Sequence, residues 1–457
     1  MTERPERAAI IRIAVTYLVG IALTGVTVLL CAYLAAIVFG GLAGDRTTPA
    51  PFPVTPALVA RGAYLAQVGD CTACHTAPGG VGFAGGLAIA SPIGVIFSTN
   101  ITPDPQTGIG RYAFGDFERA VRRGILKSGA TMYPAMPYPS YSRVTDADMA
   151  ALYAYFMHGV APVVAKNKPE QIAWPLSVRW PLVYWRWLFT PRVRAFAPSL
   201  GDSPVVARGA YLVEGLGHCG ACHTPRAITL QEEALTAQDS PRFLAGSQFN
   251  GWFAPSLRGE AASGLGRWAG ADIEEFLATG QTDRYAAFGE MGEVVLHSSQ
   301  FMTPDDRAAI AVFLQTLTPG PHNRVITGAQ PASEKFTAAR AARVGMQAYL
   351  DNCAACHQAD GAGRASSFPA LAQNPVVNSG DPTSLIHVVL AGDAEVRTRP
   401  ADSPLIMPPF GADLSDKDVA DLLTYVRASW GNRAPPVSPA QVATLRRAIG
   451  ETEPVAH

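Results

Sequence analysis

The sequence predicts a mainly α-helical protein in which an N-terminal transmembrane helix is followed by three tandem domains of one kind. Two observations lead to this prediction. An uncharged apolar run occupies the N-terminal region, and one succession of helix, five-residue motif, loop and helix then occurs three times within 457 residues. At the usual ~100 to 200 residues per domain, this length allows about three domains, each able to bury a core.

The uncharged run extends from Ile13 to Gly44 and is 32 residues long. A bilayer needs only about 20 apolar residues, and secretory signal cores are shorter, at about 7 to 15 residues. Three arginines precede the run: Arg4, Arg7 and Arg12. Cytoplasmic flanks are usually the positive ones, so everything after Asp45 is expected in the periplasm. We therefore expect residues 1–50 to be a cytoplasmic N-terminus and an anchor in the bacterial inner membrane. A long signal peptide cleaved near Ala43 is the alternative.

Six of the seven cysteines form three CxxCH motifs, and the seventh, Cys31, lies in the apolar run. The motif residues are Cys71, Cys74 and His75; Cys219, Cys222 and His223; and Cys353, Cys356 and His357. A bare CxxC could be a redox dithiol or half of a zinc site, but the adjacent histidine is the signature of c-type haem attachment. The thiols add to the haem vinyl groups and the histidine binds the iron. We predict three covalently bound haem c groups in three tandem cytochrome c domains.

A helix is expected before each motif and another at the end of each unit. The lead-in Ala60-Arg61-Gly62-Ala63-Tyr64-Leu65 returns as Ala207–Leu212, and in part as Gly345, Tyr349 and Leu350. Each closing helix starts with a hydroxyl residue followed three residues later by an aspartate, a pair that can cap two backbone amides reciprocally. These pairs are Thr145/Asp148, Thr303/Asp306 and Ser415/Asp418.

These repeats set the predicted boundaries. The cytochrome c domains are expected at residues 51–165, 201–320 and 336–432, with a Trp-rich linker at 166–200, a second linker at 321–335, and a tail at 433–457 that contains one helix from Pro439 to Ile449. The tryptophans of the Trp-rich linker suit a membrane interface or a partner groove. They would equally suit packing between the first two domains, and the sequence leaves both interpretations open.

The sixth iron ligand must come from a loop on the opposite face of each haem, and a methionine there raises the reduction potential. Met136, Met291 and Met407 follow their histidines by 61, 68 and 50 residues and precede the closing helices by 8 to 12. This common position predicts that they are axial ligands, together with His75, His223 and His357.

Other residues compete for these roles. Met132 is the rival of Met136 but lacks the proline that follows it, and His297 is the rival of Met291. Met302 is expected to be a hydrophobic residue at the start of a helix. His387 is expected in a core or at a haem edge, and His218 on the surface.

The sequence also resembles a known family, the three-haem cytochrome c subunits of bacterial membrane-bound alcohol, aldehyde and sugar-acid dehydrogenases. The resemblance extends from about residue 55 to residue 430 and is carried by four segments: Asp70–Thr76, Phe97–Asp104, Tyr133–Tyr138 and Arg179–Leu182.

In that family a separate subunit oxidises the substrate with pyrroloquinoline quinone, flavin or a molybdenum cofactor, and the cytochrome passes the electrons to ubiquinone. The resemblance thus implies a dehydrogenase subunit, ubiquinone and the membrane as partners, and axial roles for the same three methionines. Some members lack a retained N-terminal helix, so the anchor is a departure that fits the aldehyde-oxidising branch somewhat better.

Three six-coordinate irons have no open position for oxygen, nitrite or peroxide, which favours electron transfer over catalysis by the chain alone. The alternative from another class is a multihaem peroxidase or reductase in which one methionine is not a ligand. A third possibility is an electron donor to a terminal oxidase. The net charge of −1 provides no basic field that would argue for nucleic acid as a partner.

Overall fold

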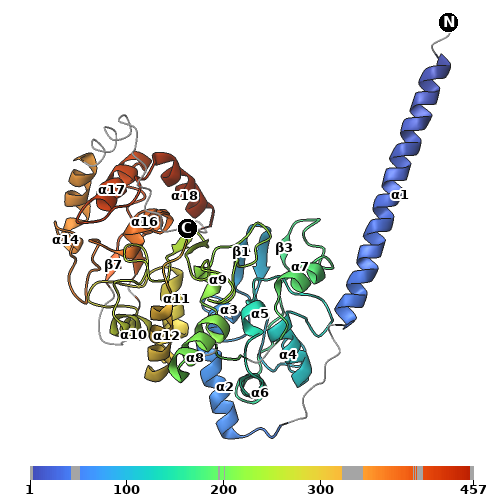
Figure 1. Ribbon diagram of the computed structural model, residues 1–457, viewed down its shortest axis with the longest axis horizontal. Coiled ribbons are helices and arrows are strands. Elements are labelled where there is room, and N and C mark those ends of the chain that lie inside the picture. The colour runs from blue at the N-terminus through green and yellow to red at the C-terminus, as the bar shows by residue number, and fades with distance from the viewer. Residues whose placement is uncertain are drawn as a thin grey trace.

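The fold is described from a computed structural model, for residues 4–42, 52–193, 196–199, 201–321, 343–394, 396, 398 and 405–452. The structure confirms a mainly helical chain with one long N-terminal helix, whose N-terminal end projects away from the folded units in Figure 1. We call residues 52–165 the first unit, 201–321 the second and 343–452 the third. The predicted linker at 321–335, beyond its first residue, and the alternative cleavage point near Ala43 lie outside the described residues.

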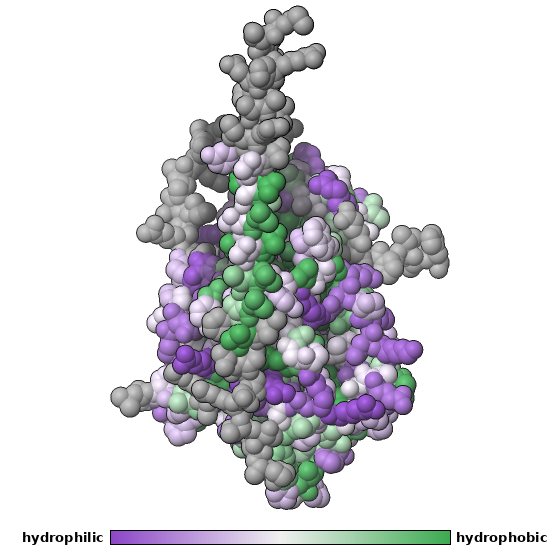
Figure 2. Space-filling view, turned by 90° about the vertical axis from the view of Figure 1, so that its right-hand side faces the viewer, coloured by the Kyte–Doolittle hydropathy of each residue, from purple (hydrophilic) through white to green (hydrophobic). Residues whose placement is uncertain are grey.

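The long helix is α1 (Arg4–Leu42), and its apolar part is Thr16–Ala36, 21 residues with a mean hydropathy of 2.2. At 1.5 Å per residue this part is about 30 Å long, which matches the hydrocarbon core of a bilayer. Figure 2 shows it as a strip of hydrophobic side chains in front of the folded units. The helix is long and apolar enough to cross a membrane, a property that a signal sequence shares.

The first unit consists of short helices around a small sheet. Its elements are α2 (Pro56–Val68), α3 (Cys71–His75), β1 (Ala88–Ser91), β2 (Gly94–Phe97), α4 (Phe114–Arg123), α5 (Tyr138–Tyr141) and α6 (Asp146–His158). The Trp-rich linker adds β3 (Gln171–Ile172) and α7 (Leu182–Phe189). The strands form an antiparallel sheet in the order β1-β2-β3, with Ala88 opposite Phe97 and Gly94 opposite Ile172. The sequence analysis did not predict this sheet.

The second unit repeats the plan with one local change. Its elements are α8 (Pro204–Tyr211), the π turn η1 (Leu212–Leu216), α9 (Gly220–His223), β4 (Ser247–Phe249), β5 (Trp252–Ala254), α10 (Gly270–Thr279), α11 (Glu290–His297), the 3₁₀ turn η2 (Ser299–Phe301) and α12 (Pro304–Thr316). Ten residues separate Gly209 from Cys219, against nine from Gly62 to Cys71. A π turn accommodates one extra residue in a helix, so η1 absorbs this difference.

The third unit begins with a helix at residues 343–352. It continues with α14 (Ala354–His357), α15 (Pro375–Asn378), α16 (Thr383–Ala391), β6 (Asp393–Ala394), β7 (Ile406–Met407), α17 (Asp416–Ala428) and α18 (Pro439–Thr452). The helix predicted from Pro439 is thus present, and Val437 and Val442 at its start are buried in the hydrophobic core of this unit. The segment predicted as a tail therefore contributes to the third core.

The lead-in helix of each unit crosses the closing helix at a glycine. A Cβ atom added at Gly62, Gly209 or Gly345 would lie 1.9, 2.0 or 2.1 Å from a backbone carbonyl oxygen of the closing helix. Those oxygens belong to Ala151, Ala309 and Asp421. The two backbones are in contact at this point, so only glycine fits there.

We expect Gly345→Ala to lower the free energy of unfolding of the third unit by about 1–3 kcal/mol or more, because the new methyl group forces the helices apart. Gly450→Ala in α18 is the matched control, since a Cβ atom at Gly450 meets nothing within 4 Å. That change should stabilise the protein by up to ~1 kcal/mol through helix propensity. Thermal denaturation of both variants measures the difference, and equal melting temperatures would contradict the proposed backbone contact.

The three predicted capping residues begin α6, α12 and α17. The hydroxyls of Thr145, Thr303 and Ser415 each accept a hydrogen bond, 3.2 Å long, from the amide three residues later. The reciprocal bond occurs at Ser415, whose amide donates to Asp418 at 3.1 Å. In the first two units Asp148 and Asp306 instead accept hydrogen bonds from Arg and Tyr side chains. The amides of Thr145 and Thr303 donate to tyrosine hydroxyls, so the prediction of a reciprocal cap is wrong there.

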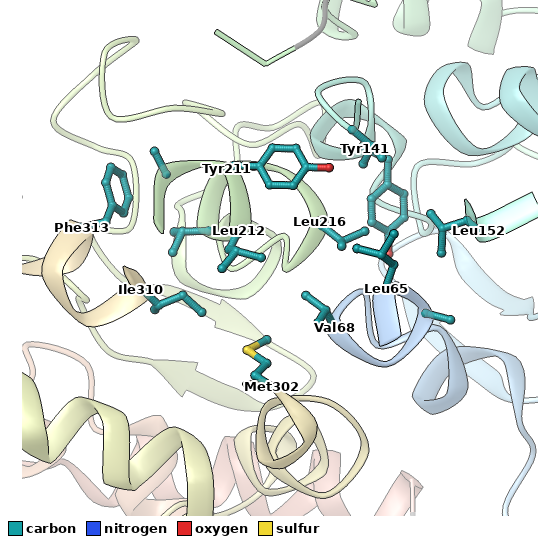
Figure 3. Packing of buried hydrophobic residues seen from close by; sticks show 14 of the residues in the cluster. Leu65, Val68, Tyr141, Leu152, Tyr211, Leu212, Leu216, Met302, Ile310 and Phe313 are labelled. Atoms are coloured by element: carbon teal, nitrogen blue, oxygen red, sulfur yellow. The ribbon is translucent and has the colours of Figure 1, made fainter. Parts of the chain in front are cut away.

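The first two units share a single hydrophobic core. Figure 3 shows Leu65, Val68 and Leu152 of the first unit beside Leu212, Leu216 and Met302 of the second. All of these side chains are at least nine-tenths buried. The third unit has a separate core built on Tyr349, Ile386, Leu422 and Val426. The first two units are therefore expected to fold as one body.

Two matched polar contacts cross the boundary between the first two units. The Tyr211 hydroxyl of the second unit donates to Asp148 of the first at 2.6 Å, and the Tyr64 hydroxyl of the first donates to Asp306 of the second at 2.5 Å. Within its own unit each aspartate also binds an arginine, Arg61 or Arg208. In each unit, the Arg–Asp ion pair thus accepts a hydrogen bond from a tyrosine of the other unit.

The third unit contacts the second through the hairpin of β4 and β5. The Trp252 ring stacks on the imidazole of His387, with ring centres 3.8 Å apart. The Nδ1 atom of His387 lies 2.9 Å from the carbonyl oxygen of Gly251, and the Phe253 amide donates to the Ser384 hydroxyl at 2.8 Å. His387 is therefore half-buried at this contact.

Candidate haem-binding sites

The three CxxCH motifs form short helical turns, α3, α9 and α14, directly after the lead-in helices. Among the described residues, no disulfide joins the two cysteines of any motif. Burial raises the pKa of both Cys71 and Cys219 to about 12. A redox dithiol instead has one thiol of lowered pKa, so the motifs do not have the character of redox dithiols.

A zinc site is no better supported. Among the described residues, no group of three or more His, Cys, Asp or Glu side chains is placed to hold a bare metal ion. Structural zinc sites use four such ligands. The motif residues suit a metal that brings its own ligands, as haem does.

Each motif histidine is oriented by a hydrogen bond from Nδ1 to a backbone carbonyl oxygen. The distances are 2.7 Å from His75 to Thr99, 2.7 Å from His223 to Pro255 and 2.9 Å from His357 to Pro369. Because a carbonyl oxygen only accepts, Nδ1 must carry the proton, and the lone pair of Nε2 is left for a metal. Burial lowers the pKa of all three imidazoles, which keeps them neutral as ligation requires.

The backbone of each histidine is held in the same way in all three units. Its carbonyl oxygen accepts a hydrogen bond from a glycine amide: Gly85 at 2.8 Å, Gly246 at 2.7 Å and Gly363 at 3.0 Å. All three glycines have positive φ angles, between 68° and 92°, which favour glycine. The repeat therefore preserves the orientation of the imidazole as well as the motif.

The carbonyl acceptors were not predicted from the sequence. They follow their histidines by 24, 32 and 12 residues, so no fixed spacing identifies them. Their shared signal is an aliphatic residue two positions later: Ile101, Leu257 and Leu371.

The third unit contains a cavity that fits a haem. It is lined by Cys353, Cys356, His357 and Met407 together. Most of the remaining lining is apolar and includes Leu371, Val377, Leu385, Val389, Phe410 and Leu422. The thiols would hold the vinyl carbons and His357 and Met407 would bind the iron, while the haem, when bound, supplies one-electron redox chemistry.

The other two predicted methionine ligands occupy different local structures. Met136 lies in a bend before α5, partly buried against the core shared by the first two units. Met291 is in the first turn of α11, although a loop was expected. The preceding Gly289 has a φ of 54°, and a Cβ atom there would lie 2.7 Å from the Trp252 ring. Their axial roles stay predictions.

Three of the other candidate residues have contacts away from the predicted ligand positions. The imidazole of His297 pairs with Glu293, its Nε2 3.2 Å from the carboxylate. Met302 is 7% exposed, in the shared core at the residue before Thr303, which is the helix-start position predicted for it. His387 is at the contact with Trp252 and not among the residues that line the third cavity.

His218 does not lie on the free surface, contrary to the prediction. Its ring is half-buried between the first two units, with Nε2 3.3 Å from the carbonyl oxygen of Gly69 and its plane edge-on to Tyr141 at 5.5 Å. The shared core brings the second motif against the end of α2, which a sequence pattern cannot reveal. Burial lowers the pKa of His218.

Asp70, directly before Cys71, is the most perturbed carboxyl group near a motif. Burial, together with the charge of Glu293, raises its pKa to about 8. One of its oxygens is buried without a hydrogen-bond partner. The first site thus has a buried carboxyl group whose protonated form is favoured by its surroundings.

Comparison with known proteins agrees with this geometry. The chain matches the cytochrome c family at residues 59–159, 206–318 and 342–430. It is 49% identical over 424 residues to the gluconate 2-dehydrogenase cytochrome c subunit of Pantoea cypripedii, covering 92% of this chain and 95% of that one.

Two further relatives are similar over comparable lengths. The chain is 50% identical over 416 residues to the cytochrome c subunit of the alcohol dehydrogenase (quinone) of Gluconacetobacter polyoxogenes, covering 90% of this chain and 89% of the relative. It is 35% identical over 441 residues to the fructose dehydrogenase cytochrome subunit of Gluconobacter japonicus, covering 91% and 89%. With its three matched segments and these relatives, the chain belongs to the cytochrome c family, in the group that contains the cytochrome c subunits of gluconate, alcohol (quinone) and fructose dehydrogenases.

Proposed function

We propose that this chain is the electron-transfer subunit of a periplasmic membrane-bound dehydrogenase complex and carries three covalent haems, each ligated by the motif histidine and by Met136, Met291 or Met407. It takes electrons from a substrate-oxidising subunit of the pyrroloquinoline quinone, flavin or molybdenum type and delivers them to ubiquinone. The main support is that all three motif imidazoles have Nε2 left for a metal by the same Nδ1 bond. The relatives, which are cytochrome c subunits of dehydrogenases, support the dehydrogenase partner.

The arrangement of the sites supports a continuous path with the second haem in the middle. The charge of Glu290, at the start of α11, acts on both Cys74 and Cys222, so the first two motifs lie close to one residue. Ala286, Ala287 and Phe288, just before Met291, line the cavity of the third unit. One short segment thus adjoins all three sites.

Two other functions are distinguishable from this one. An enzyme with an open iron would require one methionine not to be a ligand, and Met291, in a helical turn, is then the first to suspect. A donor to a terminal oxidase would keep the haem chemistry and change the partner.

We expect purification from membranes in mild detergent to recover this chain with a dehydrogenase subunit and with three low-spin haems. Six-coordinate irons with histidine and methionine ligands leave no position for carbon monoxide, so the reduced spectrum should not change when the gas is added. Quinone reduction by the intact complex, with the substrate of the copurified dehydrogenase, measures the delivery of electrons.

A haem that binds carbon monoxide in the native complex would contradict the transfer-only function and favour the enzyme. Copurification with a terminal oxidase, without a dehydrogenase, would contradict the proposed partner.

A further inference from the structure

The helix α7 of the Trp-rich linker has the polarity of a helix that faces lipid. A helix at a water-exposed surface buries its apolar side chains and exposes its charges. In α7 the single charged residue, Arg186, is only 9% exposed, whereas Trp187 and Leu188 are 68% and 61% exposed. The outer face of α7 is therefore apolar.

The same polarity continues along the segment before α7. Trp174 is 81% exposed and Leu176 is 53% exposed. From Gln171 to Pro191 the only other charged residue is Arg179, which turns inward to pair with Glu170 and to cover the Tyr133 ring. The two arginines among these 21 residues are therefore buried or half-buried, whereas four apolar side chains are more than half exposed.

A third segment, from the second unit, extends this surface. The Trp185 indole donates to the carbonyl oxygen of Thr229 at 2.7 Å, and the adjacent Ile228 is 99% exposed. We call Trp174, Leu176, Trp187, Leu188 and Ile228 the apolar rim. Exposed apolar surface of this extent marks an interaction site.

The structure places α7 against the apolar part of α1. The Tyr184 hydroxyl donates to the carbonyl oxygen of Ala32 at 2.5 Å, and the Trp180 ring meets the Tyr33 ring edge-on at 6.0 Å. Ala36, one turn further along α1, is 3% exposed, although most of the apolar part is open. In Figure 1, α7 is among the labelled elements closest to the C-terminal end of α1.

The position of this contact along α1 decides what surrounds α7. Ala32 and Ala36 belong to the stretch Thr16–Ala36 that is long enough to span the hydrocarbon core, and they precede the first charged residue, Asp45, by 13 and 9 residues. If α1 spans a bilayer, a helix packed on this part lies at the depth of the lipid or of its interface. Tryptophan and tyrosine are the residues enriched there.

We infer that α7 and the segment before it insert their apolar rim into the leaflet at the C-terminal end of α1, as a second membrane contact of this chain. The partner is the bilayer, because the rim is continuous with the membrane-spanning stretch and carries no outward charge for a polar protein surface. The inference deepens the proposed function and rests on α1 being retained as the anchor.

The inner side of α7 contacts the loop of the first site. The Trp185 ring meets the Tyr138 ring edge-on at 6.2 Å, and Tyr138 is two residues after Met136. The loop of the first site thus rests on the inner side of α7, the side that faces away from the proposed lipid contact.

The test is photolabelling of the full chain in its complex, reconstituted in phosphatidylcholine vesicles that contain a phospholipid with a diazirine in the acyl chain. Mass spectrometry of the peptides is expected to find label in α1 and in residues 171–191. Peptides from the third unit, including Val344, which is 45% exposed, serve as the internal control and should remain unlabelled.

A variant with Trp187→Glu and Leu188→Glu should lose most of the label in residues 171–191 and keep its haem content. The matched control, Val205→Glu on the exposed start of α8, should leave the labelling unchanged.

Three results would overturn the inference. Label in α1 with none in residues 171–191 would do so while leaving the proposed function intact. Protection of residues 171–191 by the dehydrogenase subunit, with labelling only after that subunit is removed, would show a protein partner and would equally overturn it. Absence of label from α1 as well would show that the anchor is not retained, and the inference would fail with it.

Discussion

A variant with Cys353→Ala and Cys356→Ala is expected to keep two covalent haems per chain, whereas the unchanged protein has three. The third unit has its own hydrophobic core, separate from the core of the first two units. Its unfolding without haem should therefore leave the other two sites intact. Acid-acetone extraction followed by the pyridine haemochrome assay counts the remaining covalent haem, and carbon monoxide should still leave the reduced spectrum unchanged. Quinone reduction by the complex should fall to background if the third haem is part of the path.

The matched variant, Cys71→Ala with Cys74→Ala, is expected to be much more damaging. Leu65 and Val68, just before this motif, pack in the core that the first two units share. Loss of the first haem should therefore loosen the second unit, so that its remaining haem binds carbon monoxide or the protein fails to accumulate. Equal behaviour of the two variants would contradict the assignment of a shared core.

Asp306→Ala is expected to destabilise the first two units by about 3–5 kcal/mol, the usual cost of breaking a buried ion pair. The Asp306 carboxylate accepts from Arg208 at 2.7 Å through both oxygens and from the Tyr64 hydroxyl of the first unit at 2.5 Å. Its removal leaves a half-buried guanidinium and a tyrosine hydroxyl without their acceptor. Denaturant unfolding of the holoprotein, followed at the Soret band, measures the loss.

The third unit supplies the matched control for this change. Asp418 occupies the same position in α17, but its carboxylate accepts hydrogen bonds from Ser415 as a helix cap. Asp418→Ala should therefore cost only about 1 kcal/mol, the usual value of a helix cap. A cost at Asp306 no larger than that at Asp418 would show that the contact between the units contributes little.

The same carboxylate predicts how the contact depends on pH. Burial alone would raise the pKa of Asp306, but the hydrogen bonds from Arg208 and Tyr64 outweigh it and lower the pKa below 3.8. A group with a lowered folded pKa stabilises the fold above its unfolded pKa, and this contribution is lost as the pH falls through the folded value. The Asp306→Ala variant should therefore lose its disadvantage only in strong acid, below pH 3.8.

Much of the local structure could be predicted from short stretches of sequence. The closing helices begin at Thr145, Thr303 and Ser415 as expected, because a cap depends only on residues within one turn. The CxxCH motifs indicate haem for the same reason, since both thiols and the imidazole lie within five residues. The long helix α1 could be predicted because an uncharged apolar run of 32 residues has few structures open to it other than a helix.

The other half of each site depends on residues distant in sequence. The acceptors of the histidine Nδ1 atoms, at Thr99, Pro255 and Pro369, are backbone carbonyl groups, which any residue can supply. Short strands such as β6 and β7, of two residues each, have too few positions for a periodic pattern to appear.

By itself, the sequence determined three attachment motifs, their capped helices and an apolar N-terminal helix, because each depends on neighbours along the chain. Only the tertiary structure decided that the first two units share one core, that Tyr64 and Tyr211 cross between them, and that α7 rests on α1. The reason is that the identity of an apolar residue such as Leu65 or Leu212 does not specify which other apolar residue it packs against. Which of them meet is decided by the shape and packing of the whole molecule.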